Sequence, residues 1–404
     1  MRRQKQLTMQ LAQRLDRMSE SATLKMSRLG RELRAKGLDI IDLSIGEPDF
    51  VTPEHIREAA KKAIDEGYTH YTPVAGYADL RKAIAEKLKR DNNLEYTPEQ
   101  IVTSTGAKHS LINVIMCVVD PGDEVIIPTP YWVTYSEQVK FVQGNVVTIR
   151  GSRENRYKIT AEQLEAAITP RTKLFMFSSP CNPSGAVYSK EELEALAAVF
   201  KKHPRIVILS DEIYEYINYV GGHQSIAQFD FLKDRVVVVN GLSKGYAMTG
   251  WRLGYIAAPL ELAKAVEKIQ GQFTSGTSSI TQRAAVHALL SDPKPSHDMV
   301  AEFKKRKDFI VAAVSSIPGI KVDDPDGAFY IFPDVSAFFG KKAGEKVMEN
   351  ADDLCMYLLE TGLVSTVTGS AFGEPDCIRM SYAASMEKLA EGAERLAKAL
   401  GALS

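Results

Sequence analysis

Residues 236–254 read VVVVNGLSKGYAMTGWRLG and decide the fold. The four valines predict a buried strand, and Lys244 follows it among small residues, eight positions before Arg252. A lysine amine becomes nucleophilic when a partly desolvated, cation-rich pocket lowers its pKa, and it then forms Schiff bases with carbonyl groups. The fork of an arginine side chain matches phosphate. An aldehyde that carries a phosphate describes pyridoxal phosphate (PLP), although a lone Ser-Lys pair is ordinarily an exposed surface lysine.

The composition is ordinary for a globular protein of two or three domains, with 404 residues, 45% hydrophobic and 25% charged. The 50 basic and 51 acidic residues balance, so neither nucleic acid nor a membrane is indicated as a partner. No apolar run could span a bilayer, the basic start lacks a secretory signal, and we expect a cytoplasmic protein. Four scattered cysteines predict reduced thiols and no metal site. The basic start allows an organelle-targeting peptide, but a structural arm helix is also predicted, by Leu7, Leu11, Leu15 and Met18.

The middle of the chain alternates predicted strands with predicted helices. Short apolar runs predict strands at residues 125–127, 146–149, 173–177, 205–209 and 236–239. Helical patterns occur at residues 108–119, 161–168 and 190–202. This rhythm predicts an α/β fold whose large domain has a mostly parallel sheet covered by helices, and such sheets bind ligands at the carboxyl ends of their strands.

The two ends of the chain lack this rhythm. After about residue 296, a long charged helical pattern leads into the alternating segment 328–332, which is typical of a smaller α+β domain. We therefore predict a large domain at residues 51–295 and a small domain at residues 296–404. Residues 1–50, which include an N-terminal arm, complete the small domain from the other end of the chain.

Three more candidate sites fall at predicted strand ends. Asp211 lies in the segment 210–214 that directly follows the predicted strand 205–209, and it could hold the proton of a pyridine ring, while Tyr214 could donate to the ring's phenolic oxygen. The alternative is a helix N-cap aspartate beside a packed tyrosine. Asn182 lies in a proline-bracketed turn, and its amide could bind the same oxygen and a substrate carboxylate. Residues 103–108, TSTGAK, open a helix whose N–H groups could hold phosphate, although any N-capped helix has a similar pattern.

Taken together, these segments resemble one family. The chain is similar to the class I aminotransferases of PLP fold type I, in the subgroup of bacterial aspartate and prephenate aminotransferases. The resemblance runs essentially end to end, through GEPDF (46–50), YTPVAG (71–76), PYW (130–132), NPSG (182–185), DEIY (211–214), SK (243–244), MTGWR (248–252) and CIRMSY (377–382). Motifs in this order leave little room for another family.

The resemblance implies PLP as cofactor and assigns residues to its ring. Lys244 would form the Schiff base and move the proton between the substrate Cα and the cofactor. Asp211 would pair with the ring nitrogen, while Tyr214 and Asn182 would contact the phenolic oxygen. Trp132 would stack on the ring, or it could be an ordinary packing aromatic.

The resemblance also implies how the phosphate is bound. The backbone of Gly106 and Ala107 and the side chain of Arg252 would hold it, next to Lys108. Tyr71 would reach the phosphate from the neighbouring subunit, which implies a homodimer with shared active sites. The alternative is that Tyr71 is an ordinary packing aromatic.

For the substrate, the resemblance implies that Arg379 clamps the α-carboxylate, assisted by Asn182 and the Gly46 backbone. Lys108, aided by Thr23, would reach the distal carboxylate of a dicarboxylic amino acid. A lysine is a mobile point charge, which fits aspartate, glutamate and bulkier acids such as prephenate. The alternatives are that Lys108 only caps the cradle helix and that Arg379 forms a surface ion pair.

Two departures from the family pattern bear on the site, whereas those at Cys181 and Ser184 are tolerable. Gly241 stands where many relatives have a serine or threonine that binds phosphate, and Ser243 would face elsewhere if the backbone there is strand-like. In the arm, Ser19 and Glu20 replace a Lys-Pro pair, while Thr23 keeps its motif position. Glu20 would repel a second carboxylate, which argues against prephenate.

We therefore expect a PLP-dependent aminotransferase that moves an amino group from an acidic amino acid, aspartate above all, to 2-oxoglutarate by a ping-pong mechanism. The alternatives are a prephenate, aromatic or broad-specificity aminotransferase and a β-lyase on the same scaffold. A PLP-sensing transcription regulator would need a further helix-turn-helix domain, and this sequence leaves no segment for one.

Overall fold

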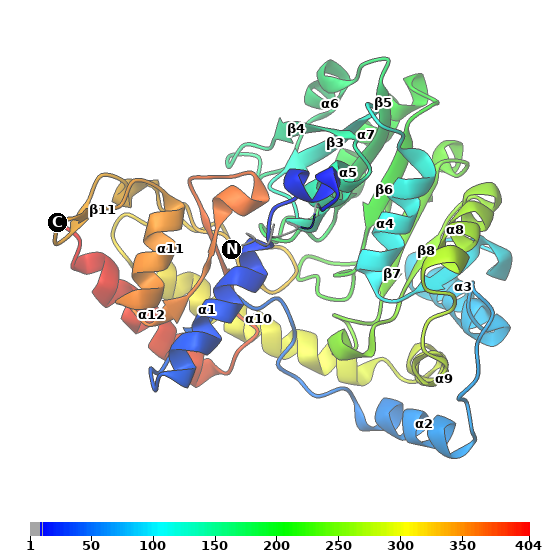
Figure 1. Cartoon of the computed structure of the whole chain (residues 1–404), viewed down its shortest axis with the longest axis horizontal. Coiled ribbons are helices and arrows are strands. Elements are labelled where there is room, and N and C mark those ends of the chain that lie inside the picture. The colour runs from blue at the N-terminus through cyan, green and yellow to red at the C-terminus, as the bar shows by residue number, and fades with distance from the viewer. Residues whose placement is uncertain (1–8, 10) are drawn as a thin grey trace, which may run out of the picture.

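The computed structural model describes residue 9 and residues 11–404, and a seven-stranded sheet forms its centre (Figure 1). In order across the sheet, the strands are β2 (Ile101–Ser104), β8 (Gly254–Ala257), β7 (Val236–Gly241), β6 (Val207–Asp211), β5 (Thr172–Ser178), β3 (Glu124–Thr129) and β4 (Asn145–Arg150). Strand β8 runs antiparallel to both neighbours, and the other pairs are parallel. The predicted α/β fold with a mostly parallel sheet is confirmed.

Helices cover both faces of this sheet because its strands are apolar on both sides. Val236 and Val238 of β7 belong to the core on one face, and Val237 and Val239 belong to the core on the other, as the two-residue period of a strand requires. The first core includes residues of α3 (Ala78–Asn92), α6 (Ala161–Ala167), α7 (Lys190–Lys202) and α9 (Ser279–Leu290), together with α2 (Glu54–Asp65). The second includes residues of α4 (Ala107–Val118), α5 (Thr134–Phe141) and α8 (Leu260–Phe273).

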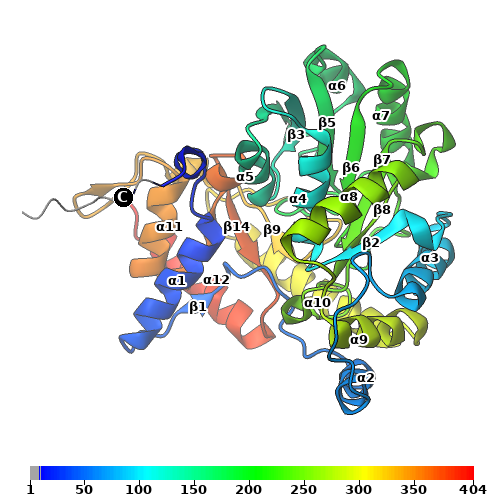
Figure 2. The same cartoon turned by 45° about the vertical axis from the view of Figure 1, so that its right-hand side comes forward.

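A second body of structure lies beside the sheet and draws on both ends of the chain (Figures 1 and 2). Its helices are α1 (Ala22–Ala35), α10 (Lys294–Ser315), α11 (Ala351–Glu360) and α12 (Met386–Gly401). Its paired strands are β1 (Ile41–Asp42) with β12 (Val364–Ser365), β10 (Lys342–Ala343) with β11 (Lys346–Val347), and the sheet of β13 (Val367–Thr368), β14 (Ile378–Ser381) and β9 (Tyr330–Ile331). The β1–β12 pair joins the chain ends, whereas the domain limits at residues 50 and 295 stay a prediction.

Two local predictions were wrong. The strand predicted at residues 205–209 is β6 at Val207–Asp211, so Asp211 is the last residue of the strand and not part of the segment after it. The predicted arm helix is reduced to a short 3-10 helix at Gln13–Arg17, and Leu7 lies outside the described residues. All described residues before Ser21 are exposed, so no tertiary contact buries the apolar side chains that such a helix would present.

Two global expectations can also be compared with the structure. All four cysteines are free. Over residue 9 and residues 11–404, no helix combines the length and the apolar character that a membrane crossing requires.

Candidate active site

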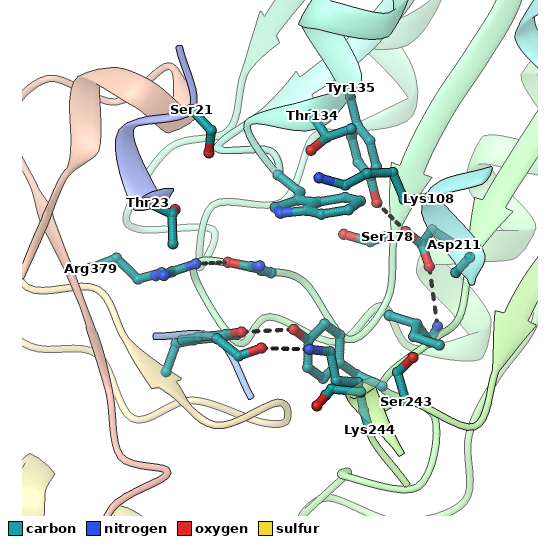
Figure 3. A pocket seen from close by; sticks show the side chains of 18 of the residues that line it. Ser21, Thr23, Lys108, Thr134, Tyr135, Ser178, Asp211, Ser243, Lys244 and Arg379 are labelled. Atoms are coloured by element: carbon teal, nitrogen blue, oxygen red, sulfur yellow. Dashed lines mark hydrogen bonds between the residues drawn. The ribbon is translucent and has the colours of Figure 1, made fainter. Parts of the chain in front are cut away.

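A cavity of about 300 Å³ lies at the carboxyl ends of the central strands (Figure 3). Ser178 and Asp211 end β5 and β6, and Ser243 follows β7, so three neighbouring strands bring polar groups to its wall. Among the predicted site residues, those that line it are Thr23, Gly46, Ala107, Lys108, Trp132, Asn182, Asp211, Tyr214, Lys244, Arg252 and Arg379. Gly106 lies against Arg252, and Tyr71 lies outside the cavity with 98% of its surface exposed.

Lys244 occupies the turn that follows β7, where its side chain is partly buried and lines the cavity. Its Nζ donates a hydrogen bond to the carbonyl oxygen of Gly46, which comes from the other end of the chain. Burial lowers the pKa of Lys244 to about 8, and the positive charges of Arg379 and Arg252 add to this effect against the opposing charges of acidic neighbours. A substantial fraction of this amine is therefore neutral just above neutral pH, as a nucleophile or a base must be.

Asp211 presents a buried carboxylate to the same cavity. Tyr135 donates its hydroxyl proton to Asp211 Oδ2 over 2.7 Å, and the backbone N–H of Ile213 donates to Oδ1 over 3.2 Å. Burial raises the pKa of Asp211 to about 6 although both hydrogen bonds oppose the shift. The residues after Asp211 form a turn and not a helix, so the alternative of an N-cap aspartate is wrong. The carboxylate can instead hold a proton on a bound ring nitrogen.

Two tyrosines of the site were missed by the sequence analysis. Tyr135 holds Asp211, and Tyr330 on β9 shares a hydrogen bond of 2.8 Å with the hydroxyl of Tyr214. Tyr135 lies one helical turn after Trp132, which is a signal that could have drawn attention to it. For Tyr330 the sequence gives only an alternating strand pattern, because its role depends on the second body of structure facing the sheet.

Arg379 is a buried guanidinium without a carboxylate partner. The residue is 1% exposed, and within the described chain no acidic side chain lies at ion-pair distance from it. Its Nη1 donates to Asn182 Oδ1 over 3.0 Å, its Nη2 donates to the carbonyl of Ser44 over 2.6 Å, and its buried Nε has no partner among the described residues. The alternative of a surface ion pair is therefore wrong. A buried cation that lacks an anion is suited to the carboxylate of a ligand.

The start of α4 forms a cradle for an anion. Gly106 has a positive φ of 85°, no side chain caps the helix, and a Cβ at this position would lie 2.2 Å from Arg252 Nη2. Arg252 is held over the helix end by hydrogen bonds to the carbonyls of Thr249 (2.9 Å) and Thr105 (3.4 Å). Free N–H groups, the positive helix end and a guanidinium together suit a phosphate.

Steric crowding explains why position 241 is a glycine and not the serine or threonine expected from the family pattern. A Cβ at Gly241 would lie 2.7 Å from the carbonyl oxygen of Leu253 and 2.9 Å from the Cα of Gly254, so a serine or threonine does not fit there. Ser243, by contrast, lies in a turn and not in a strand, and it lines the cavity. The strand-like backbone that would have turned Ser243 away is therefore absent at this position, and its hydroxyl remains available to the site (Figure 3).

Lys108 and Thr23 approach the cavity from opposite sides (Figure 3). Lys108 Nζ lies 4.8 Å from the centroid of the Trp132 ring, and within residue 9 and residues 11–404 it has no ion-pair or hydrogen-bond partner. Burial lowers the pKa of Lys108, and the charge of Arg252 adds to that shift. Thr23 Oγ1 is buried and has no partner in the same part of the chain. Both groups are free to bind a ligand.

These residues fit PLP. The cradle at α4 suits its phosphate, the buried Asp211 suits its ring nitrogen, and the neutralisable amine of Lys244 suits its aldehyde. A buried arginine and a second free cation remain for the carboxylates of a substrate.

Comparison with known proteins agrees with this geometry. The family model described as aminotransferase class I and II matches residues 38–396. The chain belongs to this family. Members of the family depend on PLP, so the protein is a PLP-dependent aminotransferase of fold type I.

Named relatives cover the whole length of this aminotransferase. It is 46% identical to a probable aspartate/prephenate aminotransferase of Rhizobium leguminosarum bv. phaseoli, over 97% of the chain and 99% of the relative. It is 45% identical to an aspartate aminotransferase of Bacillus subtilis, over 96% of the chain and 98% of the relative. The crystal structure of an aspartate aminotransferase from Rhizobium meliloti superposes with a TM-score of 0.95 at 43% identity, over 98% of this chain and all of that one.

Proposed function

We propose that this aminotransferase takes its amino group from aspartate and passes it to 2-oxoglutarate in two half-reactions at one site. The observation that carries the proposal is a pair of cations, Lys108 and Arg379, that line one cavity and have no acidic partner among the described residues. Aspartate, glutamate and their keto acids each carry two carboxylates, which two such cations match. The names of the relatives, aspartate aminotransferases among them, support the same substrate class.

The residues divide into those that hold the cofactor and one that moves protons. PLP supplies an aldehyde that binds amines and a ring that withdraws electrons from the substrate Cα. Gly106, Ala107 and Arg252 would bind its phosphate, and Asp211 would keep the ring nitrogen protonated. Lys244 Nζ would accept the proton from the substrate Cα and then pass it to the cofactor, because its lowered pKa lets it both accept and donate a proton.

Three further residues orient the ring. In the proposed site, Trp132 stacks on it, and Asn182 and Tyr214 bind its phenolic oxygen. Tyr214 is fixed by its hydrogen bond to Tyr330, and Asn182 is fixed by its contact with Arg379. Arg379, which would bind the substrate, therefore also positions Asn182, which would bind the ring.

The substrate would be fixed at both ends. Arg379 binds the α-carboxylate through the guanidinium edge that includes the unpaired Nε, with help from Asn182 and the backbone of Gly46. Lys108 and Thr23 bind the distal carboxylate. This arrangement orients the Cα–H bond toward Lys244, which is how fixed ends lower the barrier to proton transfer.

Prephenate is a second candidate acceptor, favoured by the space beyond Lys108. A neighbouring cavity of about 700 Å³ shares Ser21, Lys108 and Thr134 with the active-site cavity. Glu20, which we expected to repel a second carboxylate, lies 3.5 Å from Arg28 in an exposed ion pair. That pairing reduces the repulsion and leaves room for a larger keto acid.

We further propose a homodimer in the cytoplasm with shared active sites. Tyr71 is exposed and distant from its own cavity, although its segment has the pattern of a phosphate-binding loop. An open cavity of about 780 Å³ beside Arg252, lined by Phe50 and Trp251 among others, could receive Tyr71 of the partner subunit. The symmetry of a two-fold dimer would complete both sites at once.

A two-step assay tests the proposed reaction. The purified enzyme is mixed with single amino acids, its conversion to the pyridoxamine phosphate form is followed by absorbance, and 2-oxoglutarate or prephenate is then added. We expect aspartate and glutamate to react fastest and 2-oxoglutarate to restore the starting spectrum. A β-lyase would release ammonia and a keto acid without this return, and a preference for uncharged donors would contradict the aspartate assignment.

A further inference from the structure

A second buried polar cluster lies behind the active-site cavity. It consists of Lys87 on α3, Glu212 and Glu215 on the turn after β6, and His223 on the following loop, and we call these residues the buried quartet. Their side chains are respectively 1, 1, 4 and 5% exposed. None of them lines the active-site cavity. Charges buried this deeply destabilise a protein unless ion pairs and hydrogen bonds compensate them, so a cluster of this kind points to a specific role.

One half of the quartet joins α3 to the turn. Lys87 Nζ forms an ion pair with Glu215 and donates to Asn92 Oδ1 over 2.8 Å. Asn92 Nδ2 donates to the second carboxylate oxygen of Glu215 over 2.8 Å. Both oxygens of Glu215 are therefore satisfied by α3.

The other half joins the turn to the loop that follows. Glu212 Oε1 accepts from the hydroxyls of Ser210 and Ser225 over 2.8 and 2.5 Å, and Glu212 Oε2 lies 2.8 Å from His223 Nε2. Ligand-type atoms of Glu212, Glu215 and His223 all lie within 4.8 Å of one another. The two halves therefore act electrostatically as one network.

Counting charges identifies what the network requires. Two carboxylates face one ammonium, and a proton on His223 makes the total neutral. Burial acts to lower the pKa of His223, but the charge and hydrogen bond of Glu212 and the charge of Glu215 outweigh it and raise the pKa above its usual value. His223 Nδ1 is buried without a partner in the described structure, so Glu212, through Nε2, is the one hydrogen-bond partner of the ring there.

The other groups around the quartet do not titrate near neutral pH. Burial raises the pKa of the tyrosines that face it from neighbouring elements, which are Tyr96, Tyr216, Tyr246 and Tyr255. Burial also acts to raise the pKa of Asp91, but hydrogen bonds from Arg90 and Tyr216 outweigh it and lower the pKa. His223 is therefore the group whose protonation state sets the charge of the network.

The turn after β6 connects the quartet to the active site. Asp211 directly precedes Glu212, and Tyr214 directly precedes Glu215, so side chains along one turn alternate between the cavity and the quartet. The N–H of Glu212 donates to the carbonyl of Val239 on β7 over 2.8 Å, and the N–H of Glu215 donates to the carbonyl of Glu212 over 2.9 Å. A shift of either glutamate would therefore move Asp211 or Tyr214.

We propose that the buried quartet is a charge-balanced clamp, completed by the proton on His223, that positions Asp211 and Tyr214 for cofactor binding. Its members are positioning residues, because they act through the turn and touch no ligand. The inference rests on the proposed roles of Asp211 and Tyr214. Loss of one cation leaves a buried carboxylate uncompensated, and the turn can relieve that cost only by moving.

The substitution His223→Gln tests the clamp, with His203→Gln as its matched control. His203 Nε2 also lies 2.8 Å from a carboxylate, that of Glu165, but this pair is partly exposed and forms no hydrogen bond with a member of the quartet in the described structure. We expect His223→Gln to raise the dissociation constant of PLP at least about tenfold, or about 1.4 kcal/mol, and His203→Gln to change it less than twofold. Equal dissociation constants for wild type and His223→Gln would overturn the proposal.

The double variant Glu212→Gln/His223→Gln distinguishes two possible causes of weaker PLP binding, which are a lost charge balance and altered packing. This variant removes one negative and one positive charge, so we expect PLP affinity to return to within about threefold of wild type. The wild type should also lose affinity as pH rises through the pKa of His223, relative to the double variant, in which that proton is absent. A double variant that binds PLP as poorly as the single variant would show that charge balance is not the cause.

Two measurements on the wild-type enzyme also test the proposal. Nitrogen NMR of the histidine side chains in the wild-type enzyme should show His223 protonated at pH 7, with its signal assigned in the double variant; a neutral His223 overturns the proposal. Metal analysis of the purified enzyme is expected to give no stoichiometric divalent ion; one ion per chain that is lost in Glu215→Gln would also overturn it. The variant Asp211→Asn tests the proposed function separately, because it leaves the charges of the quartet intact.

Discussion

Replacing Lys108 with methionine should convert this enzyme from a dicarboxylate-preferring aminotransferase into one that is indifferent to the distal group. Methionine keeps an unbranched apolar side chain beside Trp132, and it removes the ammonium group, which is the charge and the hydrogen-bond donor. Because Lys108 has no ion-pair partner in the described part of the chain, the loss is borne by the substrate contact and not by another protein group.

The magnitude follows from the type of contact. A hydrogen bond to a charged group contributes about 1.5–3 kcal/mol, which corresponds to a fall of roughly tenfold to 150-fold in kcat/KM for aspartate. Alanine and phenylalanine lack the distal carboxylate, so their kcat/KM should change less than about threefold. Arg379→Lys should instead reduce kcat/KM for all three donors together, since each carries an α-carboxylate.

The assay is the initial rate with 2-oxoglutarate as acceptor, measured for each donor in wild type, Lys108→Met and an exposed control, Lys82→Met. Burial and the charge of Arg252 lower the pKa of Lys108, so its positive charge is complete at low pH and is lost as pH rises through that pKa. The preference for aspartate over alanine should therefore decline with rising pH in wild type and stay flat in Lys108→Met. A uniform loss across donors in Lys108→Met would refute the reasoning and assign the lysine to the phosphate cradle or the fold.

The remaining predictions concern the cofactor and the subunits. Gly106→Ala places a Cβ 2.2 Å from Arg252 Nη2 in a strained backbone conformation, so PLP should dissociate at least about tenfold more readily on dialysis; unchanged retention would contradict the cradle. The apoenzyme should bind PLP covalently faster as pH rises through about 8, since only the neutral amine of Lys244 reacts. Stopped-flow absorbance measures this rate, and a rate that does not change with pH would contradict the prediction. A heterodimer of Tyr71→Phe and Lys244→Ala subunits should keep about half of the wild-type activity if Tyr71 acts in trans, because both defects then collect in one site; a much lower value would indicate action in cis.

Much of the fold was predictable because its signals are local. The four valines of β7 carry the two-residue period and full burial of a parallel strand, and the helical pattern at residues 190–202 matches α7 without change. Chemical function followed from the same local features. Lys244, Asp211 and Asn182 each lie at or just after the end of a strand, and parallel strands bring such positions to one edge.

Where the sequence misled, the missing information was tertiary. The pattern of the arm predicted a helix, but apolar residues stabilise a helix only when another surface buries them, and the described arm has none. Ser243 was expected to face elsewhere on the assumption of an extended backbone, whereas the chain turns there and directs it to the cavity.

The sequence by itself determined the fold class, the nature of the cofactor and the residue types that its chemistry needs. Only the tertiary structure brought Gly46 to Lys244 across 198 positions of chain and Ser44 to Arg379 across 335. It alone paired Tyr330 with Tyr214 and enclosed the buried quartet. The physical reason is that periodicity and turn chemistry act over a few residues, whereas burial, hydrogen-bond partners and shifted pKa values arise when distant segments pack and exclude water.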